Sequence, residues 1–227
     1  MPFQMALDEI LFRRMETNLP HPNPLPQGEG RVRVVLRFYF SSEPWETVGY
    51  SYVIASEAKQ SRDCFVGLRP PRNDGHINIC RRITGGGRVE HGKDLIFSLA
   101  ARKEADASFR SVRMSYLKIH EAVKAALEEL GEKPRFYRCD EPLPKGEDCF
   151  RFPIATDLAV GGRKAAGGAQ KRSAGALLHQ ESIPLGKRDA FDLIRALRRA
   201  FEKIFAVKII TADIDPALLE EAAHERA

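Results

Sequence analysis

Two short glycine-rich segments carry the residues of this chain most able to do chemistry. One runs from Gly161 to Gln170 and places a single lysine, Lys164, between two pairs of glycines. Glycines permit positive φ and let backbone approach a ligand closely. A lysine in such a place can hold a carbonyl or phosphate oxygen as a point charge. A hairpin turn with an ordinary surface lysine fits the same pattern, so this segment alone leaves both interpretations open.

The other segment joins two consecutive arginines, Arg81 and Arg82, to the triple glycine Gly85–Gly87. Successive backbone N–H groups in such a turn can hold an anion, and an arginine adds a bidentate donor. His91 follows four residues after the last glycine, where it could bond a ligand or complete the end of a strand. Two loops of this kind in one small protein predict a shared site for an anionic or acyl ligand.

Cys149 is the candidate nucleophile. It has Arg151 nearby and precedes Lys164 by fifteen positions. If the strands that carry them pair, the ammonium group would lower the pKa of the thiol and favour the nucleophilic thiolate. A buried, inert cysteine is the alternative. The cysteines show neither a CxxC pair nor a paired-histidine spacing, so no metal site is predicted.

Three further polar residues lie close to these segments in the sequence or on predicted elements. His120 falls on the apolar face of a predicted helix and is expected to be structural. His179 falls on a strand that borders the glycine run, with its role open. Asp157 lies on the extended segment that leads to Lys164, where it could orient the lysine or bond to backbone.

The elements that position these residues follow from hydrophobic spacing and helix-end signals. Strands in hairpin-like succession, with helices between groups of strands, predict an α+β fold rather than a doubly wound parallel sheet. Helices are expected at residues 5–15, 111–130 (ended by Gly131), 189–205 and from Asp215-Pro216 onward. Strands or extended segments are expected at residues 32–40, 77–80, 94–100, 149–160, 176–183 and 207–210.

Composition sets the broad class. The chain has 227 residues and a net charge of +5, from 36 basic and 31 acidic residues. This mild excess suits acidic partners or anionic ligands but makes no electrostatic case for nucleic acid. No apolar run approaches the roughly 18 residues of a membrane span. The N-terminus has acids where a signal peptide carries bases, so a soluble, cytoplasmic protein with free thiols is expected.

Two segments have compositions that are unusual for a compact domain. Residues 18–31 carry prolines at alternate positions, which forbid helix and sheet ladder alike. Residues 53–76 are polar and contain a Pro-Pro turn, as in a long exposed loop. Both resemble translated copies of dispersed bacterial repeat elements. They are therefore expected to be insertions in a single catalytic domain that spans residues 1–227.

Three sequence blocks, occurring in one order, carry a resemblance to a known family. They are Met5–Glu9; Arg81–Gly87 with His91 and Phe97-Ser98; and Asp157–Gln170 with Leu178–Gln180. Together they resemble the lipoate–protein ligase and octanoyltransferase family, over nearly the whole chain except the two suspected insertions. The resemblance implies the biotin/lipoate ligase fold, related to class II aminoacyl-tRNA synthetases, with a mixed sheet packed by helices.

The resemblance also implies roles for individual residues. Lys164 would contact the acyl carbonyl or acyl-adenylate, and the Gly85–Gly87 loop would line an acyl tunnel with Arg82 nearby. Cys149 stands where the cysteine-using octanoyltransferases of the family place their nucleophile. The expected catalytic residues are thus Lys164 and Cys149. The expected substrate-binding residues are Arg82, Thr84, Gly85, Gly86, Gly87, His91, Gly167, Gly168, Ala169 and His179.

Two chemistries follow from the resemblance. A transferase would move octanoyl from acyl carrier protein, through a cysteine thioester, to a lysine of a lipoyl domain, and would need no cofactor. Its acceptors would be lipoyl domains of 2-oxoacid dehydrogenases or glycine-cleavage H protein. A ligase would instead use ATP and Mg²⁺ to make lipoyl-AMP.

The transferase is the leading expectation. Cys149 favours it, and so does the end of the chain at Ala227, which leaves no room for the C-terminal accessory domain of bacterial lipoate ligases. A non-catalytic or decayed homologue is the third hypothesis, because the suspected insertion at 53–76 falls before the Arg-Arg-Gly-rich loop.

Overall fold

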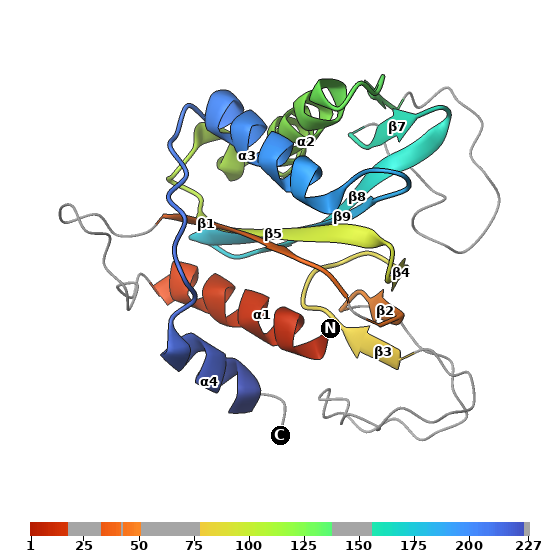
Figure 1. Ribbon diagram of the computed structural model, residues 1–227. Coiled ribbons are helices and arrows are strands. Elements are labelled where there is room, and N and C mark those ends of the chain that lie inside the picture. The colour runs from red at the N-terminus through yellow and green to blue at the C-terminus, as the bar shows by residue number, and fades with distance from the viewer. Residues whose placement is uncertain (18–32, 42, 51–77, 138–155, 225–227) are drawn as a thin grey trace.

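The computed structural model describes residues 1–17, 33–41, 43–50, 78–137 and 156–224 (Figure 1). The suspected insertions at 18–31 and 53–76 lie outside the described residues, and so does Cys149. None of the helices in the described part of the chain is long and apolar enough to cross a membrane.

A six-stranded sheet forms the centre of the molecule, and every neighbouring pair of its strands is antiparallel. Two adjacent strands of this sheet, β5 (Asp94–Arg102) and β9 (Ala176–Pro184), are buried along almost their whole length. The strand order across the sheet is β1 (Val34–Tyr39), β5, β9, β8 (Arg163–Arg172), β7 (Leu158–Val160) and β6 (Arg135–Phe136).

A smaller sheet has the order β3 (Asn78–Arg81), β2 (Trp45–Val48) and β4 (Arg88–His91). In it β2 runs parallel to β3 and antiparallel to β4. The mixed character expected from the sequence therefore resides in this smaller sheet. Together with the helices, the two sheets confirm the α+β class.

Helices cover both faces of the large sheet (Figure 1). On one face, α2 (Val112–Glu129) and α3 (Ala190–Phe205) pack side by side, after the short 3-10 helix η1 (Ala107–Arg110). On the other face lie α1 (Pro2–Thr17) and α4 (Pro216–His224). Alternate residues of β5 serve the two sides, since Phe97 and Leu99 join the α2–α3 core while Ala100 joins the core around α1. This double coverage explains why residues on both faces of β5 are apolar.

The end of α2 shows how closely the sequence determines local structure. Gly131 has φ +84, and its N–H donates to the carbonyl of Glu128 at 3.0 Å. The N–H of Glu132 donates to the carbonyl of Leu127, also at 3.0 Å. These two bonds satisfy carbonyls at the end of the helix and require the left-handed backbone that glycine adopts freely. The predicted helix stop at Gly131 is confirmed.

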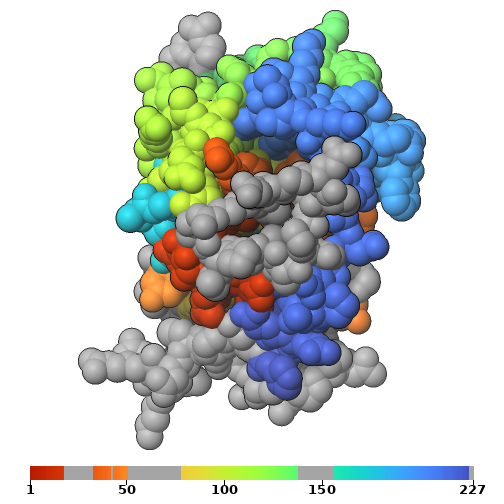
Figure 2. Space-filling view, turned by 90° about the vertical axis from the view of Figure 1, so that its left-hand side faces the viewer, coloured from red at the N-terminus to blue at the C-terminus, as the bar shows by residue number. Residues whose placement is uncertain are grey.

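The strand predicted at 207–210 is wrong. This segment continues from α3 toward α4 without strand structure, and the C-terminal residues run down the side of the molecule shown in Figure 2. Side chains of α3 satisfy the backbone groups of Ile209 in this segment. Arg198 donates to the carbonyl of Ile209 at 2.8 Å, and Glu202 accepts from the Ile209 N–H at 2.9 Å. Ile209 therefore needs no strand partner.

Candidate functional site

A cavity of about 170 Å³ has walls from both sheets and from α1. Its lining includes seven of the residues predicted from the sequence, namely Lys164, Arg82, Gly86, His91, Gly167, Gly168 and Ala169. The two glycine-rich segments thus meet at one place, as their composition predicted. Thr84, Gly85, Gly87 and His179 stand outside this lining and contribute through the contacts given below.

Lys164 lies at the start of β8, directly after a tight turn. Gly161 and Gly162 form that turn with φ +56 and +76, values that other residues rarely adopt. The Lys164 Nζ atom forms an ion pair of 2.7 Å with Oδ2 of Asp157, and the two side chains are only 9% and 3% exposed. Asp157 therefore orients the lysine, which was one of the two roles considered for it. The ammonium group is held at the wall of the cavity.

Arg82 is a buried clamp for the glycine-rich loop. Its Nη2 donates to the carbonyls of Gly85 and Gly87 at 2.9 Å each, and its Nη1 donates to Oγ1 of Thr47 at 3.0 Å. These hydrogen bonds use guanidinium donors to fix the shape of the loop. Arg82 thus acts on the cavity wall through the protein, although its own side chain belongs to the lining.

The same loop depends on a glycine that sequence reasoning did not single out as a site residue. A Cβ atom at Gly49 would lie 2.0 Å from the carbonyl oxygen of Gly86, so no other residue fits without movement of the backbone. The N–H of Gly49 also donates to the carbonyl of Gly87 at 3.2 Å. Gly86 itself has φ +90. The close approach of β2 to the loop therefore requires glycine on both sides.

Thr84 connects the loop to the rest of the fold. Its hydroxyl donates to Oε1 of Gln180 at 2.7 Å, and Nε2 of Gln180 donates to Oδ2 of Asp8 at 2.7 Å. Asp8 is fully buried on α1 and also accepts from the Tyr39 hydroxyl at 2.9 Å. Burial, followed by the charge of Asp8, raises the pKa of Tyr39 well above its usual value. Thr84 is a structural link from the loop, through β9, to α1.

His91 bridges a carboxylate and a hydroxyl. Its Nδ1 lies 2.6 Å from Oδ2 of Asp94, and its Nε2 lies 2.8 Å from Oγ1 of Thr47. Asp94 also accepts from the Ser182 hydroxyl at 2.6 Å and from the Gly92 N–H at 3.0 Å. Burial raises the pKa of Asp94, but the hydrogen bonds from these neighbours outweigh it and hold the pKa below its usual value. His91 both lines the cavity and fixes the end of β4.

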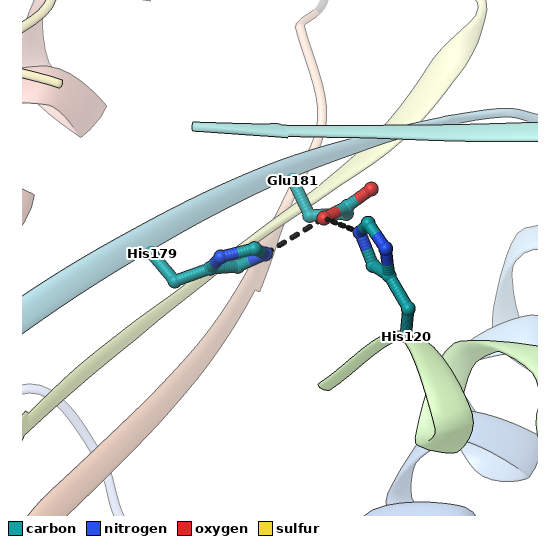
Figure 3. A group of neighbouring side chains, drawn as sticks. All are labelled: His120, His179 and Glu181. Atoms are coloured by element: carbon teal, nitrogen blue, oxygen red, sulfur yellow. Dashed lines mark hydrogen bonds and ion pairs between the residues drawn. The ribbon is translucent and has the colours of Figure 1, made fainter. Parts of the chain in front are cut away.

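A second histidine–carboxylate group lies buried between β9 and α2 (Figure 3). Oε2 of Glu181 accepts from Nε2 of His179 at 2.7 Å and from Nε2 of His120 at 3.0 Å. All three side chains are fully buried, and Nδ1 of His120 bonds the carbonyl of Thr156. We call these three residues the buried trio. It ties α2 to the segment that carries Asp157.

The electrostatics of the buried trio are those of an ion pair. Burial raises the pKa of Glu181, but the charge of His120 and the hydrogen bonds from both histidines outweigh it and lower the pKa to about 2. Burial lowers the pKa of His120, yet the carboxylate of Glu181 outweighs that effect and raises it. For His179 burial prevails, and its pKa is lowered. These directions favour an ionised carboxylate at Glu181 and a more basic imidazole at His120 than at His179.

The trio is also the one group among the described residues with three potential metal ligands close together. Its hydrogen bonds oppose metal binding. Oε1 of Gln170 accepts from Arg172 at 2.8 Å, so its amide nitrogen faces Nδ1 of His179 at 3.2 Å. The proton of neutral His179 therefore resides on Nε2, and His120 carries protons on both nitrogens. Neither Nε2 atom offers a lone pair to a cation.

The buried trio leaves no space for a side chain at position 168. A Cβ atom at this position would lie 2.3 Å from Oε2 of Glu181 and 2.6 Å from Cε1 of His179. The sequence suggested that small residues after Lys164 leave room for a ligand, and Gly168 belongs to the cavity lining. The space that its own Cβ would occupy is filled by Glu181 and His179. Its neighbours Gly167 and Ala169 pair with Ser182 and Gln180, two further residues of the cavity lining.

Glu181, Asp94 and Thr47 were missed by sequence reasoning, and two of them had a usable signal. Glu181 lies two residues after His179 on a predicted strand, so the two share a face. Asp94 follows His91 by three residues, at the start of a predicted strand. Thr47 had no such signal, because its contact with His91 depends on the pairing of β2 with β4.

Comparison with known proteins gives a consistent set of relatives. The family model described as the lipoyl protein ligase A/B catalytic domain matches residues 1–206. Octanoyltransferase LipM of Moorella thermoacetica is 30% identical over 184 residues, which are 80% of this chain and 60% of that protein. Octanoyltransferase LipM of Exiguobacterium sibiricum is 31% identical over 188 residues, again 80% and 60%. The chain thus spans about 60% of the length of these curated relatives.

Solved structures agree on the fold. A lipoate-protein ligase A bound with ATP matches with a TM-score of 0.69 at 20% identity, covering 98% of this chain and 88% of that one. A bi-partite lipoate protein ligase from Thermoplasma acidophilum, studied with its E2 lipoyl domain, matches with a TM-score of 0.65 at 18% identity, covering 98% and 86%. At these identities the likeness concerns the fold alone.

Proposed function

This chain belongs to the lipoyl protein ligase A/B catalytic domain family, and from this premise we propose that it transfers an octanoyl group onto a lysine of a lipoyl carrier domain. The proposal is supported by relatives that carry the name octanoyltransferase and match 80% of the chain. It is also the chemistry that the sequence favoured through Cys149 and Lys164.

The observation that carries the proposal is the position of Lys164. Its ammonium group lies at the wall of the cavity, held by Asp157 at 2.7 Å. A fixed positive charge at that place can bond the oxygen of an acyl carbonyl and stabilise the negative charge that develops there when a nucleophile attacks. Asp157 removes the need to order the long lysine side chain during the reaction.

The rest of the cavity suits an acyl chain. Met5, Val89 and Ile96 contribute apolar side chains to its lining, and the glycine-rich loop supplies backbone. Such a mixture of apolar walls with a few placed polar groups is typical of small-ligand sites. Arg82 keeps the loop in shape, so we assign it a supporting role in binding. His179, as a member of the buried trio, supports the opposite wall.

The reaction has two acyl transfers. The thiolate of Cys149 attacks the octanoyl thioester of acyl carrier protein, a new C–S bond forms, and the carrier thiol leaves. The amine of the acceptor lysine then attacks the enzyme thioester, the amide bond forms, and the cysteine is released after loss of a proton from nitrogen. Division into two steps makes each one easier. Neither step needs ATP or a metal ion.

The acceptor is proposed to be the lipoyl domain of a 2-oxoacid dehydrogenase or glycine-cleavage H protein. The structural relative from Thermoplasma acidophilum was studied with its E2 lipoyl domain, which supports an acceptor of this kind. The net charge of +5 on this chain favours encounter with an acidic carrier.

Intact-mass measurement tests the proposal. Incubation with octanoyl carrier protein is expected to add one octanoyl group to the wild-type protein, and Cys149→Ser is expected to lose this thioester. Addition of apo lipoyl domain should then move the group to that domain. Release of pyrophosphate with lipoate and Mg-ATP would instead favour the ligase chemistry, as in the ATP-bound structural relative. Failure of both reactions would favour a non-catalytic homologue.

A further inference from the structure

The cavity contains a second set of groups suited to acyl chemistry, separate from Lys164. Oγ1 of Thr47, on β2, lies 2.8 Å from Nε2 of His91, on β4. Nδ1 of His91 lies 2.6 Å from Oδ2 of Asp94, on β5. Thr47 and His91 both belong to the lining of the cavity. A hydroxyl, an imidazole and a carboxylate thus form a hydrogen-bonded chain that begins at the cavity wall.

The direction of each hydrogen bond follows from the partners. Arg82 can only donate, and its Nη1 donates to Oγ1 of Thr47 at 3.0 Å. Oδ2 of Asp94 can only accept, so Nδ1 of His91 donates to it. With its proton on Nδ1, the neutral imidazole has a lone pair on Nε2, which accepts from the Thr47 hydroxyl. In this arrangement Oγ1 of Thr47, both ring nitrogens of His91 and both carboxylate oxygens of Asp94 have hydrogen-bond partners.

The carboxylate is fixed independently of His91. The Ser182 hydroxyl donates to Oδ2 of Asp94 at 2.6 Å, and the Gly92 N–H donates to Oδ1 at 3.0 Å. Asp94 thus holds the imidazole in one tautomer and one orientation. A nucleophile bonded to a base, with the base oriented by a third group, is the arrangement that activates a hydroxyl.

We propose that Thr47 is an acyl-accepting nucleophile, activated by His91 and Asp94, which takes medium-chain acyl groups from activated thioesters or esters. Arg82 stabilises the negative charge that develops on Oγ1 as the proton leaves. The acyl class follows from the cavity, whose apolar lining adjoins the ammonium group of Lys164. The proposal goes beyond lysine acylation and does not depend on Cys149.

The chemistry balances without a further reagent. Oγ1 of Thr47 attacks the acyl carbon, a C–O bond forms, and the hydroxyl proton moves to Nε2 of His91. The bond to the leaving thiolate or phenolate breaks, and His91 can return its proton to that group. Water then attacks the Thr47 ester with His91 as base. The acid is released, and the proton passes back to Oγ1.

The test uses the full chain with Cys149→Ala, which removes the thioester route, and p-nitrophenyl octanoate as the probe. Reactions stopped in acid at short times are expected to show one octanoyl group by intact mass, on the peptide that contains Thr47. Thr47→Ser should retain the adduct and Thr47→Val should lose it. Ser98→Ala is the matched control, because Ser98 is another buried hydroxyl that donates to a carboxylate, that of Asp8, and it should keep the adduct.

His91→Gln separates activation from mere exposure of a hydroxyl. Loss of the base is expected to slow ester formation on the order of 100-fold. Absence of the adduct, its location on another residue, or an adduct formed equally by Thr47→Val would overturn the proposal. If Thr47→Val does not fold, acylation of Thr47→Ser together with the slow rate of His91→Gln decides the matter, and failure of either one contradicts it.

Discussion

Two histidine–carboxylate groups flank the cavity, and they differ in how far their side chains are accessible from it. In the buried trio both histidines bond one carboxylate oxygen of Glu181, and all three side chains are fully buried. In the other group, His91 bonds Asp94 on one side and the Thr47 hydroxyl on the other, next to the cavity. The same residue types therefore serve as internal support in one place and face a ligand site in the other.

The hydrogen bonds of the two groups end in different surroundings. The buried trio ends in backbone and in the amide of Gln170, so every bond leads back into the protein. The His91 group ends at a hydroxyl beside open volume. Burial and ion pairing perturb pKa values strongly in the trio, of which Glu181 alone belongs to the cavity lining. The other group contributes two lining residues, Thr47 and His91, and so has the greater access to a ligand.

The largest expected effect breaks the buried trio. Glu181→Ala leaves the positive charge of His120 buried without its partner, and it should lower the free energy of unfolding by about 3–5 kcal/mol. His91→Gln, measured the same way by urea denaturation, should cost less than half as much, because its partners lie beside the cavity. Equal losses in the two variants would remove the distinction between the groups.

The pH dependence of stability probes the same trio. The folded-state pKa of Glu181, about 2, lies below its ordinary 4.5. The stabilisation it gives is thus complete above pH 4.5 and is lost as the pH falls toward 2. It amounts to about 3 kcal/mol in the wild type.

Glu181→Gln is the control for this dependence. Its unfolding free energy should fall less steeply than that of the wild type between pH 4.5 and 2. Parallel acid profiles for the two proteins would show that the carboxylate of Glu181 is not held by the histidines.

Gly168→Ala tests whether the trio fills the space beside β8. The added Cβ would approach Oε2 of Glu181 to 2.3 Å, and relief of this overlap should cost about 1–3 kcal/mol of stability. Gly161→Ala is the matched control, because its Cβ meets no atom within 4 Å and only its positive φ is strained. A larger thermal shift for Gly161→Ala would show that the fold tolerates a side chain at 168.

A smaller effect is expected on the cavity side. Asp157→Asn removes the anionic partner of Lys164, so the ammonium group is no longer held at the wall of the cavity. Octanoyl transfer should slow on the order of tenfold, with the change in kcat rather than in KM for the acyl donor. A change confined to KM would place Asp157 in substrate binding instead.

Sequence reasoning went furthest where local chemistry determines structure. Gly131 ends α2, and Gly161 and Gly162 turn the chain before Lys164, as positive φ requires. The pairing of Lys164 with Asp157 was one of the two roles that the sequence left open for Asp157, because the segment that carries it leads to the lysine. Contacts between distant elements were not foreseen. The partnership of His120 with Glu181 depends on how α2 packs over β9, and that of Thr47 with His91 depends on strand register.

The apolar run at 207–210 shows the opposite limit. Its β-branched residues predict a strand, yet Arg198 and Glu202 of α3 satisfy the backbone of Ile209. Local propensity was overridden by tertiary contacts. Arg82 was expected among substrate-binding residues, and it lies in the cavity lining with its guanidinium also bonded to the glycine-rich loop, a contact that the sequence did not predict.

The central claim is that Lys164, at the cavity wall, supports transfer of an octanoyl group to a lipoyl domain. Its most direct test is the intact mass of an apo lipoyl domain after incubation with octanoyl carrier protein and either the wild type or Lys164→Ala. We expect one added octanoyl group with the wild type, and a rate lower on the order of 100-fold or more with Lys164→Ala. Equal acylation by the two proteins would contradict it.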